Sequence, residues 1–240
     1  TVSIITALLP RLSRQAHDKD LPAFGGELSA SLRLVSALII PSAIFLLVAG
    51  PWVGALLYGY GASSTDQGAA LGGIASMFAL GLPAFSLFYV LLRSYYAQEN
   101  TKTPFLINLG FNGLHIVIGF ALFSLMPNGL QVAGLALGYS ISYVITCALT
   151  WHRVGKRVPE IRKNGHLRLI VRVSAASILA AFVSYLLVRV TITNQSDLSA
   201  LRVAGAIGIF SVSFSLIYVG LAKLLHISEV SAVLALVRRK

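Results

Sequence analysis

Long hydrophobic runs separated by short polar segments are the main pattern of this chain. A bilayer core about 30 Å thick requires about 20 apolar residues of helix to cross it. The runs are continuous and do not alternate between apolar and polar positions, which favours helices over the strands of a membrane barrel. The pattern therefore predicts an all-α, polytopic transmembrane helix bundle. Six runs are complete, and they extend approximately over Leu34 to Tyr58, Ala69 to Leu92, Pro104 to Met126, Gly129 to Trp151, Leu169 to Arg189 and Leu201 to Leu225.

The opening segment TVSIITALLP is also apolar, but it is too short to span a membrane before Pro10. No basic region or small-residue cleavage site precedes the first polar loop, so the segment does not resemble a signal peptide. We expect it to be the end of a seventh span. The chain is then expected to begin inside a larger protein.

The composition agrees with a membrane protein, because 56% of the residues are hydrophobic and only 11% are charged. The net charge of +11 could suggest a nucleic-acid partner, but its distribution indicates topology instead. When loops are assigned alternately to two sides, 17 of the 19 Lys and Arg residues fall on one side, and only Arg189 and Arg202 fall on the other. Positive charge is retained in the cytoplasm during insertion. We therefore expect the 93–105 loop, the 151–168 loop and the C-terminus to be cytoplasmic, and no nucleic-acid partner.

Two cytoplasmic segments could also contact lipid headgroups. The basic segment HRVGKRVPEIRKNGHLR, residues 152–168, could bind anionic headgroups, although a topology signal alone is the favoured interpretation. After the last span, residues 227–240 place apolar side chains on one helical face. This pattern predicts a short helix on the inner membrane surface or, alternatively, the lead-in to a soluble region.

Residues that could support catalysis do not converge anywhere in the sequence. The carboxylates fall in loops or at the ends of spans, the five histidines lack zinc-type spacing, and no glycine-rich phosphate loop is present. The single cysteine, Cys147, lies inside a span and is interpreted as a packing residue. We expect no enzyme, no catalytic residue, no metal site and no cofactor.

The third run contains polar residues at helical spacing. Asn108, Asn112, His115 and Gly119 lie at i, i+4, i+7 and i+11, which places two amides and an imidazole on one stripe. Polar side chains at membrane depth usually face the bundle interior or a watery cavity. A cavity wall is the favoured interpretation of this stripe, and hydrogen bonding between helices is the alternative.

A second stripe lies in the fourth run, where Tyr139, Tyr143, Thr146 and Thr150 share one helical face. Here hydrogen bonding between helices is favoured over a cavity wall. Small residues four apart also predict close helix packing, and they occur as Gly134 with Gly138 and as Ala204 with Gly208.

Three segments resemble one known family. RSYYAQENTKTP, residues 93–104, is similar to the R-x-[FY]-[YF]-A-x-x-[DN]-T-[KR]-T-P signature of the MurJ/MviN family, although no weight is placed on Glu99 and Asn100. ITALLPRLSR, residues 5–14, resembles the family's T-x-L-L-P-x-L-S-R segment, and residues 31–61 resemble the span that follows it. With the order of spans, the similarity covers essentially all 240 residues.

The resemblance implies a fold and an activity. Members of this family are lipid II flippases of the multidrug/oligosaccharidyl-lipid/polysaccharide exporter superfamily, in the bacterial inner membrane. They have 14 spans and move undecaprenyl-pyrophosphate-linked peptidoglycan precursor to the outer leaflet by alternating access. This chain would be the C-terminal half, so the family's cavity arginines precede Thr1. The last two spans would form the groove for the lipid tail.

Five residues are therefore predicted to contact substrate. Arg93 and Lys102 border the polar loop and are expected to capture the headgroup, and Asn108, Asn112 and His115 are expected to line the cavity beyond it. Thr103 is the expected N-cap, with the following proline in the first helical turn.

The expected organisation has four parts. They are residues 1–152 as the C-terminal lobe of the transporter core, 153–168 as a basic cytoplasmic loop, 169–226 as a two-helix lipid-groove pair, and 227–240 as an interfacial helix or lead-in. The expected partners are lipid II, membrane lipids and cytoplasmic cell-wall regulatory proteins. Two alternatives stay open: another exporter of the same superfamily, for polysaccharide repeats or drugs, and a membrane scaffold for cell-wall assembly that transports nothing.

Overall fold

The computed structural model describes residues 10, 12–18, 20–60, 63–163, 165–191 and 200–231. Within these ranges every regular element is an α-helix, which confirms the predicted all-α fold. The helices with defined bounds are α2 (Leu21–Tyr58), α3 (Thr65–Ala79), α4 (Leu82–Tyr96), α5 (Lys102–Leu125), α6 (Gln131–Arg157), α7 (Glu160–Lys163), α8 (His166–Thr191) and α9 (Ala200–Leu224).

Five helices are long and apolar enough to cross a membrane, namely α2, α5, α6, α8 and α9. The bent pair α3 and α4 brings this number to six if the pair is counted as one span. The chain is therefore a multi-pass membrane protein. Residues 1–9, which were expected to end a seventh span, lie outside the described residues, as do residues 232–240 of the expected interfacial helix.

The run from Ala69 to Leu92, predicted as one span, is divided between α3 and α4, which meet at an angle of 44°. Two residues at the junction account for the break. Pro83, at the start of α4, has no backbone N–H to continue the hydrogen bonding of α3. Gly81 lies so close to α6 that a Cβ there would be 2.7 Å from the Cα of Ser140.

The basic segment 153–168, predicted as a loop, is largely helical. Helix α6 continues to Arg157, and α7 and the start of α8 follow within the segment. Lys156 and Arg157 occupy the last turn of α6, where positive charge interacts favourably with the helix dipole.

Contacts divide the chain into two compact units. Unit 1 comprises residues 1–39 and 81–170, and unit 2 comprises residues 40–80 and 171–240. The boundaries fall inside α2 and α8, and at the junction of α3 and α4. The four-part organisation predicted above concerns functional parts, and it stays a prediction.

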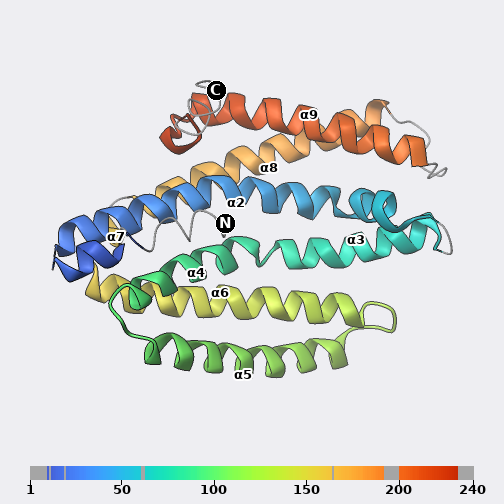
Figure 1. Cartoon of the computed structure of the whole chain (residues 1–240). Helices are drawn as coiled ribbons and strands as arrows, with labels where there is room; N and C mark the ends of the chain where they lie inside the picture. The colour runs from blue at the N-terminus through green and yellow to red at the C-terminus, as the bar shows by residue number, and fades with distance from the viewer. Residues whose placement is uncertain are drawn as a thin grey trace. The chain divides into compact units, whose positions relative to one another are not determined.

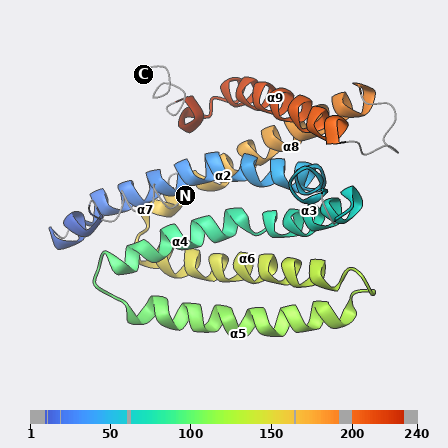
Figure 2. The same ribbon diagram turned by 45° about the vertical axis from the view of Figure 1, so that its right-hand side comes forward.

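In unit 1, α6 lies between α4 and α5, and α5 and α6 run antiparallel (Figure 1; Figure 2). The predicted close packing at Gly134 and Gly138 is confirmed. A Cβ at Gly138 would lie 3.0 Å from the Cα of Gly119 on α5, and one at Gly134 would lie 2.9 Å from the Cγ of Met126. The core of this unit includes the fully buried Phe88 of α4.

In unit 2, the second half of α2 packs closely on α3 through two pairs of glycines that were not recognised in the sequence. Gly50 and Gly54 of α2 meet Gly72 and Gly68 of α3, where added Cβ atoms would collide with the facing backbone. The hydroxyl of Ser76 donates a hydrogen bond of 3.2 Å across this contact to the carbonyl of Leu46. Small residues thus allow two helix backbones to approach each other.

The close packing predicted at Ala204 and Gly208 of α9 is wrong within the described residues. Ala204 is exposed, and a Cβ at Gly208 would meet nothing within 4 Å. Another side of α9 makes the contacts, because Phe210 packs against Trp52 and Phe45 of α2, with ring centroids 5.6 Å and 5.3 Å away. The spacing of small residues therefore identified the wrong face of this helix.

Candidate functional site

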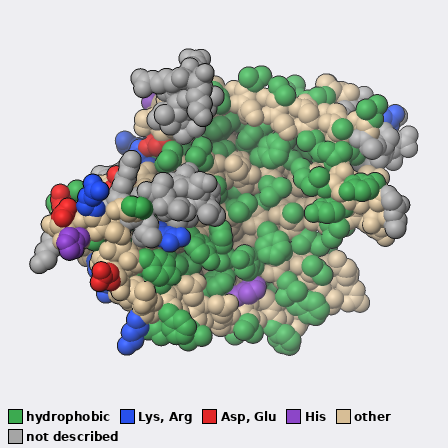
Figure 3. All heavy atoms as spheres, in the orientation of Figure 1, with side chains coloured by type: hydrophobic (Ala, Val, Ile, Leu, Met, Phe, Trp, Pro, Cys, Tyr) green, Lys and Arg blue, Asp and Glu red, His purple; other side chains and the backbone are tan. Residues whose placement is uncertain are grey.

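The polar island of the sequence forms a tight turn between α4 and α5. Charged side chains gather at this end of unit 1, whereas hydrophobic side chains cover the helices beyond it (Figure 3). Arg93 lies in the last turn of α4 and is half-buried. Its guanidinium carbon is 5.8 Å from the ring centroid of Tyr96, which is within the range of a cation–π contact.

The turn itself is held by Asn100. The Oδ1 of Asn100 accepts a hydrogen bond of 3.0 Å from the backbone N–H of Thr103. The backbone N–H of Asn100 donates to the carbonyl of Tyr95 at 3.0 Å. Glu99 before it has a φ of +57°, which only a minority of non-glycine residues adopt. The two positions given no weight in the sequence are therefore the ones that form the turn.

The start of α5 differs from the prediction by two residues. The helix begins at Lys102 with Thr101 as N-cap, and the side chain of Thr101 makes no capping hydrogen bond. Thr103 is therefore not the N-cap. The carboxamide of Asn100 supplies the acceptor instead, and the signal for it was an Asn three residues before Thr103.

Lys102 is exposed at the first turn of α5, and Arg93 lies on the other arm of the same turn. Both predicted headgroup-capturing residues therefore belong to one end of unit 1. The structure records no shared contact between them.

Asn108 and Asn112 donate hydrogen bonds within their own helix. The Nδ2 of Asn108 donates to the carbonyl of Pro104 at 2.9 Å, and the Nδ2 of Asn112 donates to the carbonyl of Asn108 at 2.8 Å. Asn108 is half-buried and Asn112 is exposed. Over the described part of the chain, neither amide bonds to a neighbouring helix, so these contacts give no support to hydrogen bonding between helices.

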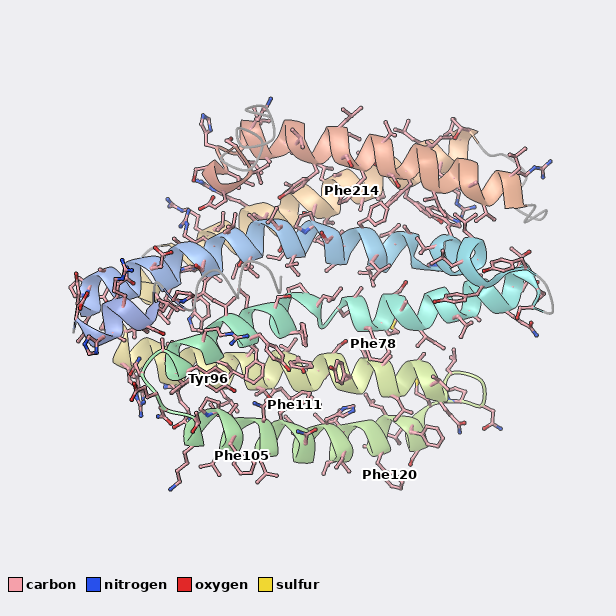
Figure 4. All side chains as sticks on the ribbon, in the orientation of Figure 1. Phe78, Tyr96, Phe105, Phe111, Phe120 and Phe214 are labelled. Carbon is pink, nitrogen blue, oxygen red and sulfur yellow. The ribbon has the colours of Figure 1, made fainter. Side chains whose placement is uncertain are left out.

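His115 is half-buried, and its ring contacts two aromatic rings. The ring lies parallel to Phe111 with centroids 6.0 Å apart, and it meets Tyr139 of α6 edge-on at 5.2 Å. Its Nδ1 is buried and has no hydrogen-bond partner among the described residues. Figure 4 shows Phe111 on the side of α5 that faces α6. His115 is therefore a residue of the α5 stripe whose side chain packs against α6.

The Tyr and Thr stripe of α6 is part of the core. Tyr143 is 4% exposed and packs against Phe111 and Phe85, with ring centroids 4.2 Å and 5.1 Å away. Thr146 and Thr150 are also buried, and Thr150 donates to the carbonyl of Thr146 at 2.8 Å. Tyr143 therefore packs between helices, whereas the hydrogen bonds from Thr150 to Thr146 and from Tyr139 to Tyr143 stay within α6, so hydrogen bonding between helices by this stripe stays a prediction.

A metal centre is not formed by the described residues, since no three His, Cys, Asp or Glu side chains come together there. The arrangement offers neutral donors and acceptors along α5 and cations at one end of it. Such a surface can bind and release a polar or anionic group.

Comparison with known proteins assigns the family. The model of the family described as lipid II flippase MurJ matches residues 1–204, most of the chain. The chain belongs to the MurJ family. The resemblance seen in the sequence motifs is thereby confirmed.

Curated MurJ relatives are similar over much of this chain. It is 26% identical to a probable lipid II flippase MurJ of Rhizobium meliloti over 75% of its length, and 27% identical to the lipid II flippase MurJ of Burkholderia cenocepacia, also over 75%. A probable lipid II flippase MurJ of Thermotoga maritima is 32% identical over 60% of the chain. The matched part covers 34%, 34% and 28% of these proteins, respectively, so the chain spans about a third of the relatives' length.

A solved structure of a lipid II flippase MurJ, in an inward closed conformation, has the same fold. The TM-score is 0.67 at 23% identity, and the match covers 93% of this chain and 43% of that one. The helical architecture described here is therefore that of the matched part of this structure.

Proposed function

We propose that this chain is part of a flippase that moves lipid II from the inner to the outer leaflet of the bacterial inner membrane. The family match over residues 1–204 is the observation that carries the proposal. Transport of this kind makes and breaks no bond, which agrees with a site that offers polar groups along a helix. The role is that of a transporter and not of an enzyme.

The physical problem in such transport is the headgroup. A pyrophosphate with attached sugars cannot enter hydrocarbon unshielded, because an unpaired charge costs many kcal/mol there. The polyprenyl tail can remain in lipid throughout. A polar path for the headgroup and a lateral opening for the tail are therefore sufficient, and α8 with α9 is the pair we assign to the tail.

Asn108, Asn112 and His115 form the polar path on α5 in this proposal. Counted from Pro104 at about 1.5 Å per residue, they lie about 6, 12 and 16 Å into the membrane. Because Asn112 is exposed in this chain, its amide at that depth must face water or protein to avoid hydrocarbon. Neutral groups suit a path that has to release its cargo, since a fixed strong charge would retain the pyrophosphate.

Arg93 and Lys102 capture the headgroup at the cytoplasmic end. Arginine presents a planar fork of donors to phosphate, whereas lysine presents a point charge. The excess of Lys and Arg on this side supports the cytoplasmic assignment of the turn and of the C-terminus. The basic segment 153–168 on this side is where cytoplasmic cell-wall regulatory proteins would bind.

Complementation of a flippase-depleted strain by the full-length parent protein tests the proposal. We expect the parent to restore growth and Asn112→Leu to impair it at unchanged expression. Phe120→Leu is the matched control, because Phe120 is exposed on the same helix but lies off the stripe. Equal tolerance of both changes would contradict a role of the stripe, and failure of the parent itself would contradict the assigned activity.

A further inference from the structure

A second candidate site lies in unit 1, away from the α5 stripe. Helices α4, α6 and the first turns of α8 enclose a cavity of about 590 Å³. The lining includes Ala84 and Leu87 of α4, Val144 of α6, and Leu167 and Ile170 of α8. The volume lies within the range of about 300–1,000 Å³ found for small-molecule sites. None of the five residues predicted to bind lipid II lines this cavity.

The cavity is mainly apolar and opens to the outside of unit 1, since Val144 is 51% and Leu167 is 75% exposed. Helices α6 and α8 are both long and apolar enough to cross a membrane, and a surface on such helices can meet lipid. An empty apolar hollow would deprive its lining atoms of dispersion contacts, and water finds few partners in it. A hydrocarbon chain is the occupant that satisfies this lining.

One end of the cavity is polar, and contacts with other residues hold His166 in place there. Trp151, His152 and His166 line it there. His166 is 4% exposed, its Nε2 lies 2.9 Å from the hydroxyl of Ser29, and its ring meets that of Trp151 edge-on at 5.2 Å. Tryptophan side chains prefer the level of the lipid headgroups. The polar end therefore marks the membrane interface, and the apolar part extends toward the bilayer centre.

The charge around the polar end favours an anionic headgroup. Lys156 is exposed one helical turn beyond His152 on α6, and the exposed Arg168 follows Leu167 on α8. Residues 151–172 hold seven Lys and Arg residues and one acidic residue, Glu160. Each cation near an anionic lipid surface contributes about 1 kcal/mol to binding.

We propose that this cavity binds one acyl chain of an anionic phospholipid of the bilayer, with the phosphate beside His152 and Lys156. Such a lipid would join α4, α6 and the start of α8 at the cytoplasmic interface. The site is separate from the path proposed for lipid II, and it does not depend on that path. A bound lipid here would couple the position of α8 to the composition of the inner leaflet.

Quenching of Trp151 fluorescence by brominated lipids tests the proposal. The test uses the full-length protein with its other tryptophans replaced by Phe, in phosphatidylcholine bilayers. Equal fractions of brominated phosphatidylglycerol or brominated phosphatidylcholine are added. We expect phosphatidylglycerol to be preferred at least about fivefold, the effect of one nearby cation. Equal quenching by the two lipids, or none by either, would overturn the proposal.

Two variants locate the lipid. Val144→Phe fills the cavity and should abolish the preference, whereas Val132→Phe, at a position of 55% exposure on α6 outside the cavity, should retain it. Lys156→Gln should weaken the preference and leave quenching by phosphatidylcholine unchanged. If Val144→Phe does not fold, the parent and Lys156→Gln still decide the outcome. A preference unchanged in the folded Val144→Phe variant, or displacement by undecaprenyl phosphate at lower concentration than by phosphatidylglycerol, would contradict it.

Discussion

Neighbouring helices α5 and α6 carry polar stripes with similar spacing, yet the two stripes have different surroundings. Asn112 of α5 is exposed, whereas Tyr143 of α6 is 4% exposed and surrounded by aromatic rings. The two stripes differ in burial because α6 lies between α4 and α5, whereas α5 packs mainly on α6. Accordingly, 17% of the apolar segment of α5 is buried, against 44% for α6. Helical spacing identifies the residues that share a face but not what covers that face.

The largest effect is expected at the largest buried side chain of the α6 stripe. Tyr143→Ala removes a ring that packs on Phe111 and Phe85, and we expect it to lower stability by about 3 kcal/mol. Tyr143→Phe keeps the ring and loses the hydroxyl, which lies 3.4 Å from the Tyr139 hydroxyl, so it should cost less than about 1 kcal/mol. The measurement is thermal unfolding in detergent. Similar loss in both variants would indicate that the hydroxyl, and not packing, matters.

A smaller effect on stability is expected at the contact between α5 and α6. Gly138→Val places a β-branched side chain against Gly119 and should cost about 1–3 kcal/mol by forcing α5 away from α6. Gly113→Val on α5 is the control, since an added Cβ there meets nothing within 4 Å. The same unfolding assay applies. If the two substitutions had equal effects, close approach of the helices would not explain the loss.

The smallest effect on stability is expected at the turn that positions the α5 stripe. Asn100→Ala removes the acceptor for the Thr103 N–H and should cost about 1 kcal/mol. Asn100→Asp retains an oxygen acceptor and should preserve stability. Hydrogen exchange of the first turn of α5 measures the effect directly. Unchanged protection in Asn100→Ala would show that Asn100 does not anchor the helix.

Much of the fold could be predicted from the sequence, because the length and apolarity of a span are local properties. The hydrophobic runs correspond to helices for this reason. The run from Ala69 to Leu92 was predicted as one span, because its apolarity does not show that Gly81 contacts Ser140 of another helix at the bend. The packing of Gly50 on Gly72 was missed because sequence alone does not say which helices meet.

The candidate site was predictable only in part. The spacing of Asn108, Asn112 and His115 follows from the helical period, and the turn before α5 follows from the family signature. The role of Asn100 in that turn was visible as an Asn at capping distance but was not used. The contact of His115 with Tyr139 could not be predicted, because it depends on how α5 packs against α6.

The most direct test of the central claim is the accessibility of position 112 in the full-length protein. Asn112→Cys, in a background with Cys147→Ala and no other cysteines, should react with a membrane-impermeant maleimide, and added lipid II should slow the reaction. Phe120→Cys, on the same helix and 73% exposed, should remain unlabelled because it faces hydrocarbon. A protected cysteine at position 112, or labelling unaffected by lipid II, would contradict a water-filled path for the headgroup along α5.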